Sequence, residues 1–249
     1  MLAELRVMTE GLNAWQAGAS GEVLVGTLLA ASKLVAEAIT RLRKAVPHVT
    51  VEVRVGTNVG LFPALERGDI DVVVGYLPRT GERALDRCDS VRLAHHPLHD
   101  EALCVVVNRR HPLAGCRKLS AGELEGADWV LPSRDSVAYG AAIRFLERIG
   151  VVPPRHAVYS VSVLTTLALV REQPMLAMMP RSPAEMLVRA GLISILPLKI
   201  QDIIGAVGYT LRADRPQPPA VRRFLDALHE CSRAHGEQSP SGASAVDRA

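Results

Sequence analysis

Three short groups of hydroxyl and amide side chains stand where a strand should end or a helix should begin. They are Thr57-Asn58, residues 133–136 (Ser-Arg-Asp-Ser) and residues 160–162 (Ser-Val-Ser). The first N–H groups of a helix have no partner within the helix, and the helix dipole makes that end positive, so such positions attract anions. For any one group, plain helix capping is the simpler interpretation. Three groups on one rim would favour a ligand site.

Other reactive side chains form weaker patterns. His95-His96 and His99 have no cysteine or carboxylate cluster at ligand spacing, so we predict exposed loop histidines rather than a metal site. Asp69 and Asp71 resemble a pair of acids, but we expect one to cap the entrance of a strand and the other to face solvent. The sequence contains no GxSxG, HExxH, GxGxxG or GxxxxGKS motif. We therefore predict no catalytic residue, no metal ligand and no cofactor.

Composition excludes several classes of protein. The chain has 249 residues, a net charge of +3, and 48% apolar residues, which is typical of one or two globular domains. That charge is too small to imply a polyanionic partner by itself. No apolar run is long enough to cross a bilayer, and the N-terminus lacks the apolar region of a signal peptide, so we expect a cytoplasmic protein. The four cysteines have no CxxC spacing and are predicted to be reduced thiols, with a redox pair as the alternative.

Residues 50–76 form the unit that positions the first polar group. Apolar and charged residues alternate over 51–55, which predicts a strand, and a continuous apolar run predicts a buried strand over 70–74. The helix between them should end at Gly68, since glycine takes the left-handed position after a helix at no steric cost. Ligands of open α/β sheets bind outside the carboxyl ends of parallel strands. The unit therefore places two dipeptides at the mouth of a cleft, Thr57-Asn58 and Gly75-Tyr76.

Strands and helices alternate through the rest of the chain. Further strands are predicted over 22–27, 102–108, 129–132, 157–161, 175–179, 193–198 and 206–211, with a charged loop over 79–100. Helices are predicted to begin at Ser32, at Ser120 and Ser182 with capping boxes, after 133–136, at Ser162 and after Pro218-Pro219. Two β-α-β-α repeats, 22–76 and 102–198, predict an α/β fold with two Rossmann-like subdomains and a cleft between them.

The chain should cross between these subdomains twice, near 97–101 and near 205–208. The expected divisions are 1–20 as the end of a helix, 21–97 plus 206–235 as subdomain I, 98–205 as subdomain II, and 236–249 as a disordered tail. The first helix carries an apolar seam at coiled-coil spacing, which predicts a dimer, with an amphipathic helix packed on its own domain as the alternative. That seam consists of Leu5, Met8, Leu12 and Trp15.

A series of short motifs along the chain carries a resemblance to a known family. The motifs are Thr57-Asn58, Gly68-Asp69-Ile70-Asp71, His111-Pro112-Leu113, Trp129-Val130-Leu131-Pro132, Met179-Pro180, and Arg212-Ala213-Asp214 before a terminal helix. Over residues 21–235 the chain resembles the effector-binding domain of LysR-type transcriptional regulators. It is most similar to the branch that contains the galactose-binding-protein regulator and the protocatechuate-pathway regulators.

This resemblance implies a fold like that of type 2 periplasmic binding proteins, attached through a long dimerisation helix to a winged helix-turn-helix. It implies a homodimer or homotetramer that senses a small effector, anionic or polyhydroxylated, with no enzymatic activity and no membrane contact. DNA would be bound only through an N-terminal domain that is missing before Gly21. Ala30 departs from the Ser or Thr that the family often has there, and Gln173-Pro174 from a common glycine pair. A stand-alone solute-binding protein of the same fold, or an enzyme using the cleft, are the alternatives.

The effector site is expected between the subdomains. Hydroxyls and unpaired backbone N–H groups bind carboxylates or sugar hydroxyls without a costly buried charge. Arg134 and Arg181 are the basic residues placed near enough for a carboxylate contact, with Arg181 expected in solvent. The predicted effector-binding residues are Leu29, Ala30, Thr57, Asn58, Ser133, Arg134, Ser136, Ser160, Ser162, Met179 and Pro180.

Overall fold

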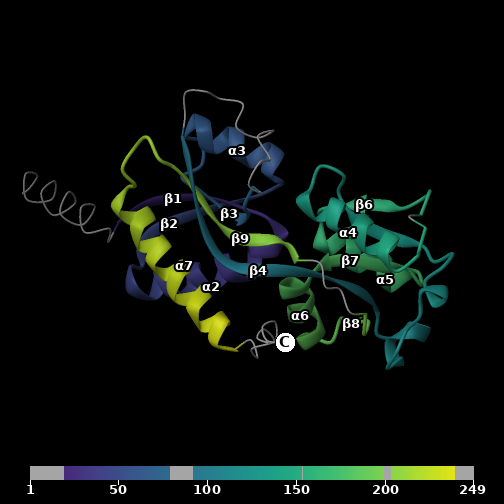
Figure 1. The fold of residues 1–249 in the computed structure, drawn as a ribbon. Helices are drawn as coiled ribbons and strands as arrows, with labels where there is room; N and C mark the ends of the chain where they lie inside the picture. Colours follow the sequence, from purple (N-terminus) through teal and green to yellow (C-terminus); the bar gives the residue numbers. More distant parts are fainter. Residues whose placement is uncertain (1–19, 79–91, 153, 199–202, 239–249) are drawn as a thin grey trace, which may run out of the picture.

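The computed structural model describes residues 20–78, 92–152, 154–198 and 203–238 (Figure 1). The strands are β1 (Ser20–Thr27), β2 (His48–Val55), β3 (Val72–Tyr76), β4 (Leu93–Asn108), β5 (Trp129–Pro132), β6 (Val158–Ser160), β7 (Leu176–Pro180), β8 (Ile193–Ile195) and β9 (Ile203–Arg212). The α-helices are α2 (Ser32–Ala45), α3 (Asn58–Arg67), α4 (Val137–Arg148), α5 (Val163–Glu172), α6 (Arg181–Arg189) and α7 (Pro219–Gln238). Short 3₁₀ helices are η1 (Leu29–Ala31), η2 (Pro112–Gly115) and η3 (Ala121–Glu123). The predicted alternation of strands and helices is confirmed.

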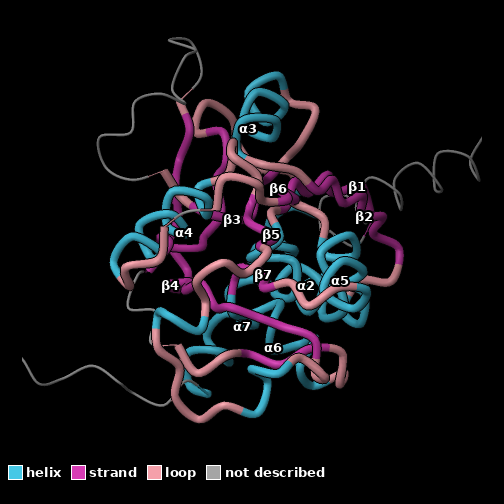
Figure 2. The backbone as a smooth tube through the Cα atoms, turned by 90° about the vertical axis from the view of Figure 1, so that its right-hand side faces the viewer, coloured by secondary structure: helices cyan, strands magenta, loops and turns pink. Residues whose placement is uncertain are grey.

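The strands form one curled sheet in two halves. In the first half β2, β1 and β3 are parallel, and β9 pairs antiparallel with β3. In the second half β6, β5 and β7 are parallel, and β4 pairs antiparallel with β7 and β8. Figure 1 shows the two halves on either side of β4, and Figure 2 views the second half, with α3 above its strands and α6 below.

β4 and β9 join the two halves. β4 pairs with β9 over its first part and with β7 and β8 over its last part, and the β4–β9 register shifts between Pro97 and His99 and between Glu101 and Ala102. The expected boundary at 97/98 therefore falls inside a continuous strand. The loop predicted over 79–100 is wrong for 93–100, and 79–91 lies outside the described residues. The histidines and the proline interrupt the apolar pattern that is typical of a strand, and it is the pairing with β9 that makes this segment a strand.

Two of these histidines contact β9 directly. His95 Nδ1 lies 2.9 Å from Thr210 Oγ1, and the His96 ring stacks on Tyr209 with ring centroids 4.6 Å apart. They lie on a strand, not on the predicted loop.

At the chain ends, α7 reaches Gln238, so helix continues into the tail expected from 236. The predicted apolar seam of the first helix lies outside the described residues.

Helices cover the sheet through apolar stripes. α2 buries Leu34, Val35, Ala38 and Leu42, and packs against α7. The largest fully buried side chains include Trp129, Phe62, Phe145 and Phe224, from both halves. Burial of one such side chain contributes about 1.5–3 kcal/mol. The apolar core therefore includes side chains from both halves of the sheet. Within the described residues, no helix is both long and apolar enough to span a bilayer.

Helix ends follow the predicted chemistry with one exception. Gly68 ends α3 with φ 84°, and Ser120 and Glu123 form the expected capping box of η3. The box predicted at Ser182 is wrong, because α6 begins at Arg181 and its N-terminus is capped from a distant strand. The buried Glu101 of β4 accepts hydrogen bonds from Ser182 N at 3.4 Å and from the adjacent Ala102 N. Burial raises the pKa of the Glu101 carboxyl.

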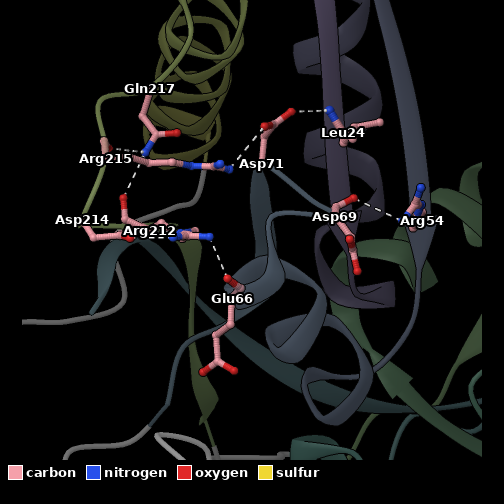
Figure 3. Close-up of polar contacts among 9 residues, drawn as sticks. All are labelled: Leu24, Arg54, Glu66, Asp69, Asp71, Arg212, Asp214, Arg215 and Gln217. Atoms are coloured by element: carbon pink, nitrogen blue, oxygen red, sulfur yellow. Dashed lines mark hydrogen bonds and ion pairs between the residues drawn. The ribbon is translucent and has the colours of Figure 1, made fainter. Parts of the chain in front are cut away.

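A polar network fastens the outer end of the first half (Figure 3). Arg212 Nη1 donates to Glu66 O at 2.7 Å, at the C-terminal end of α3, and its guanidinium also pairs with Asp214. Asp71 Oδ2 accepts from Leu24 N at 2.9 Å, which confirms a carboxylate cap at a strand. Asp69, the other acid of the predicted pair, lies half-exposed beside an arginine. Neither acid lies in a catalytic arrangement.

Candidate functional site

A pocket lies between the two halves, at the carboxyl ends of their parallel strands. Its cavity volume is about 60 Å³, well below the roughly 300–1,000 Å³ of typical small-ligand sites, so a ligand of that size needs the two halves to move apart. The first half contributes Leu28, Leu29, Ala30, Val55, Gly56, Thr57 and Tyr76. The second half contributes Pro132, Ser133, Ser136, Ala138, Ser160, Val161, Thr166, Met178, Met179 and Pro180. The location predicted from strand direction is therefore where this pocket lies.

Most of the predicted site residues line this pocket. They are Leu29, Ala30, Thr57, Ser133, Ser136, Ser160, Met179 and Pro180. Two details differ from the prediction. Leu29 and Ala30 belong to η1 rather than to the end of β1, and Ser136 alone caps α4, accepting from Tyr139 N at 3.3 Å. Ser133 precedes that helix in a turn.

The other three predicted residues have different roles. Asn58 is buried at the start of α3, where its Nδ2 donates to Tyr76 O at 3.0 Å and fastens the helix to β3. The Arg134 guanidinium lies over the Tyr159 ring, with Cζ 4.4 Å from the centroid. Ser162 caps α5 by accepting from Thr165 N at 3.2 Å. None of the three lines the pocket, and the half-exposed Arg181 lies near Glu185 on α6, as expected for a solvated arginine.

A hydrogen-bonded bridge crosses the mouth of the pocket. Thr57 Oγ1, at the N-cap position of α3, donates to Asp135 Oδ2 at 3.0 Å, and Ser133 Oγ donates to the other carboxylate oxygen. These hydrogen bonds, with that from Ser133 the larger influence, lower the pKa of Asp135. Asp135 lies within the polar group 133–136, but nothing in the sequence shows that this loop meets Thr57. Sequence reasoning missed it for that reason.

Tyr76 lines the pocket and has a buried hydroxyl. The residue is 4% exposed, and its Oη is buried without a hydrogen-bond partner among the described residues. Burial, with a smaller contribution from the charge of Glu101, raises the pKa of Tyr76 well above its ordinary value. The phenol therefore stays neutral and keeps its proton. None of the described residues that line the pocket carries a charge.

None of the three described cysteines lines this pocket. Cys104, Cys116 and Cys231 are free thiols, and Cys88 lies outside the described residues. Burial raises the pKa of the Cys104 thiol to about 12, so the thiol is not ionised at neutral pH. Reduced thiols remain a prediction for all four cysteines.

The curled sheet in two halves, with a pocket between them, has the periplasmic-binding-protein-like fold. Solved structures share this fold. The effector-binding domain of QuiR in complex with shikimate has a TM-score of 0.67 and 17% sequence identity, covering 87% of this chain and 99% of that chain. Full-length CbnR complexed with its target DNA has a TM-score of 0.68 and 18% identity, covering 93% of this chain and 75% of that chain.

The chain belongs to the LysR substrate-binding domain family, whose model matches residues 16–232. It is 30% identical to the HTH-type transcriptional regulator GbpR of Azospirillum brasilense, over 99% of this chain and 72% of that protein. It is 31% identical to the regulator GalR of Pseudomonas putida, over 92% of this chain and 56% of that protein. The matched region is a ligand-sensing domain of LysR-type transcriptional regulators, which confirms the family expected from the sequence motifs.

Proposed function

We propose that the pocket between the halves binds the effector of this regulator, and that binding changes the angle between the halves. The observation that carries the proposal is the pocket itself, since both halves supply its lining and the Thr57–Asp135 bridge spans its mouth. A ligand shifts such an equilibrium only by its difference in affinity for the two arrangements. A molecule that contacts both walls of the pocket binds one arrangement of the halves more tightly than another.

The two halves would move as subdomains, 21–97 plus 206–235 and 98–205. The register shifts of the β4–β9 ribbon support bending at this ribbon, because ladder hydrogen bonds are interrupted there. Small-molecule binding is further supported by QuiR, whose effector-binding domain is complexed with shikimate, and by the regulatory domain of Synechocystis CcmR, complexed with 2-PG.

The wider assembly is part of the same proposal. The full regulator would act in the cytoplasm as a homodimer or homotetramer, without catalysis, and would contact DNA through a helix-turn-helix domain. CbnR complexed with its target DNA supports this arrangement. Light scattering of this chain at tens of micromolar should give at least a dimer mass, and a monomer mass would contradict the assembly.

The test of the site begins with a thermal-shift screen of sugars, sugar acids and aromatic carboxylates, because a ligand of the native state raises stability by mass action. Calorimetry with the best ligand then compares Thr57→Val and Ser133→Ala with the wild-type chain. Loss of a hydroxyl contact should weaken binding by about 1–3 kcal/mol in each variant. The matched control is Ser162→Ala, which removes a hydroxyl outside the pocket. Unchanged affinity in both pocket variants would place the ligand elsewhere.

A further inference from the structure

A carboxylate lies beside the pocket, hydrogen-bonded to two of the residues that line it. The Asp135 carboxylate accepts the hydroxyl protons of Thr57 and Ser133, the two side chains that a bound carboxylate would use. Thr57 stands at the N-cap of α3 but makes no side-chain cap hydrogen bond, so its hydroxyl is directed to Asp135 instead. The positive end of α3 thus has a carboxylate from the protein beside it.

We propose that Asp135 is a specificity-determining residue, an internal carboxylate that selects uncharged, hydroxyl-rich effectors over carboxylates. The inference rests on the effector-binding function proposed above. It narrows the chemical class of the ligand, because the sequence left both anionic and polyhydroxylated effectors open.

Hydrogen-bond inventory gives the first reason. Each carboxylate oxygen accepts about two hydrogen bonds, so Asp135 can receive a ligand hydroxyl while it keeps Thr57 and Ser133. A ligand carboxylate only accepts, and it would have to take those two hydroxyls away. Two carboxylates would then stand side by side at the mouth. Hydrogen bonds to its charged form keep Asp135 ionised at neutral pH, so the resulting repulsion is not relieved by protonation.

The remaining lining gives the second reason. A cation would offset the repulsion between Asp135 and an anionic ligand, but the described residues that line the pocket include no Lys, Arg or His. Arg134, the nearest candidate from the sequence, is held over the Tyr159 ring. Tyr76 has a buried neutral phenol whose Oη lacks a partner among the described residues. A ligand with several hydroxyls can accept from this phenol with one of them and donate to Asp135 with another, whereas a carboxylate can only accept.

The experiment compares wild type with Asp135→Ala, Asp135→Asn and the control Glu125→Gln. Glu125 is an exposed carboxylate on the same half that does not line the pocket, so the control makes the same change of charge as Asp135→Asn. The first probe is sodium acetate, titrated against sodium chloride at equal ionic strength, with melting temperature as the readout. Acetate should stabilise Asp135→Ala along a saturable curve, because the two hydroxyls and the α3 N-terminus are then available to it. It should not stabilise wild type or Glu125→Gln. An equal response in wild type and Asp135→Ala would overturn the proposal.

The second probe is a set of neutral sugars, each paired with its own sugar acid, with affinities measured by calorimetry. Wild type should prefer the neutral member of a binding pair by about tenfold or more, which is about 1.4 kcal/mol. Asp135→Asn should reduce that preference by about the same factor. A wild-type preference for the acid, or a ratio unchanged by Asp135→Asn, would refute the role of Asp135. If no pair binds, the proposed function loses support, and the acetate comparison still decides the inference.

Discussion

Gly208 lies on β9, in the ribbon of two strands that joins the halves, with no room for a side chain. It pairs with Pro97 across β4 and β9, and a Cβ built on it would overlap the backbone oxygen of His96. The same Cβ would lie 2.9 Å from Leu77 Cδ1. A flexible side chain can move away from such a contact, but a backbone oxygen within a sheet cannot. We therefore expect Gly208→Ala to separate the strands and destabilise the protein.

The magnitude follows from two opposing effects. Overpacking of a well-packed site costs about 1–3 kcal/mol, and contact with the backbone puts this site at the upper end. Alanine also restricts the unfolded chain more than glycine does, which returns about 0.4–1 kcal/mol. The net loss in the free energy of unfolding should be about 2 kcal/mol.

Gly60→Ala is the matched control. Gly60 lies in the exposed first turn of α3, and a Cβ there would meet nothing within 4 Å. Since alanine favours a helix more than glycine, this variant should gain about 0.5–1 kcal/mol. Urea unfolding of both variants, with equal m-values, measures the difference. A Gly208→Ala variant within about 0.5 kcal/mol of wild type would refute the close approach of the strands.

Three further results are expected. Glu101→Gln should melt at the same temperature as wild type below pH 4.5 and at a higher temperature at pH 8. Because the folded-state pKa of Glu101 is raised, the protonated carboxyl contributes stability at low pH, and this stability is lost as pH rises through that pKa. Gln does not ionise, so the variant keeps its stability. A smaller gap at pH 8 than at pH 5 in a melting series would contradict this. Tyr76→Phe should stabilise the unliganded protein by about 1 kcal/mol in urea unfolding, because a buried unpaired hydroxyl is removed, and should weaken effector binding in calorimetry. Ser162→Ala should lose about 1 kcal/mol in the same unfolding assay through its lost cap, with unchanged effector affinity.

Local patterns predicted much of the fold. Buried apolar runs located β3, β5 and β7, the left-handed Gly68 ended α3, and Ser162 capped α5 as expected. These features depend on residues within a few positions of one another, so one sequence contains the information. The pocket was also predictable in outline, because strand direction determines which loops share an edge.

Features that depend on distant partners could not be predicted. The first part of β4 is ordered by β9, and α6 is capped by Glu101 from 81 residues away. The bridge between Thr57 and Asp135 joins residues 78 apart. For Asn58 and Arg134 the sequence pattern predicted a position at or just before a helix start, but not the direction of the side chain, which a backbone carbonyl and an aromatic ring determine.

The position of β9 in the sheet has a consequence for folding during synthesis on the ribosome. The strands of the second half, from β4 to β8, emerge as one uninterrupted stretch, whereas β9 and α7, which complete the first half, are translated last. Until then β3 has no neighbour on one side, and α2 and β1 lack the helix that packs against them. Nascent chains fold in units as these become complete. The second half should therefore acquire its native structure first, and the first-synthesised strands should wait longest for theirs.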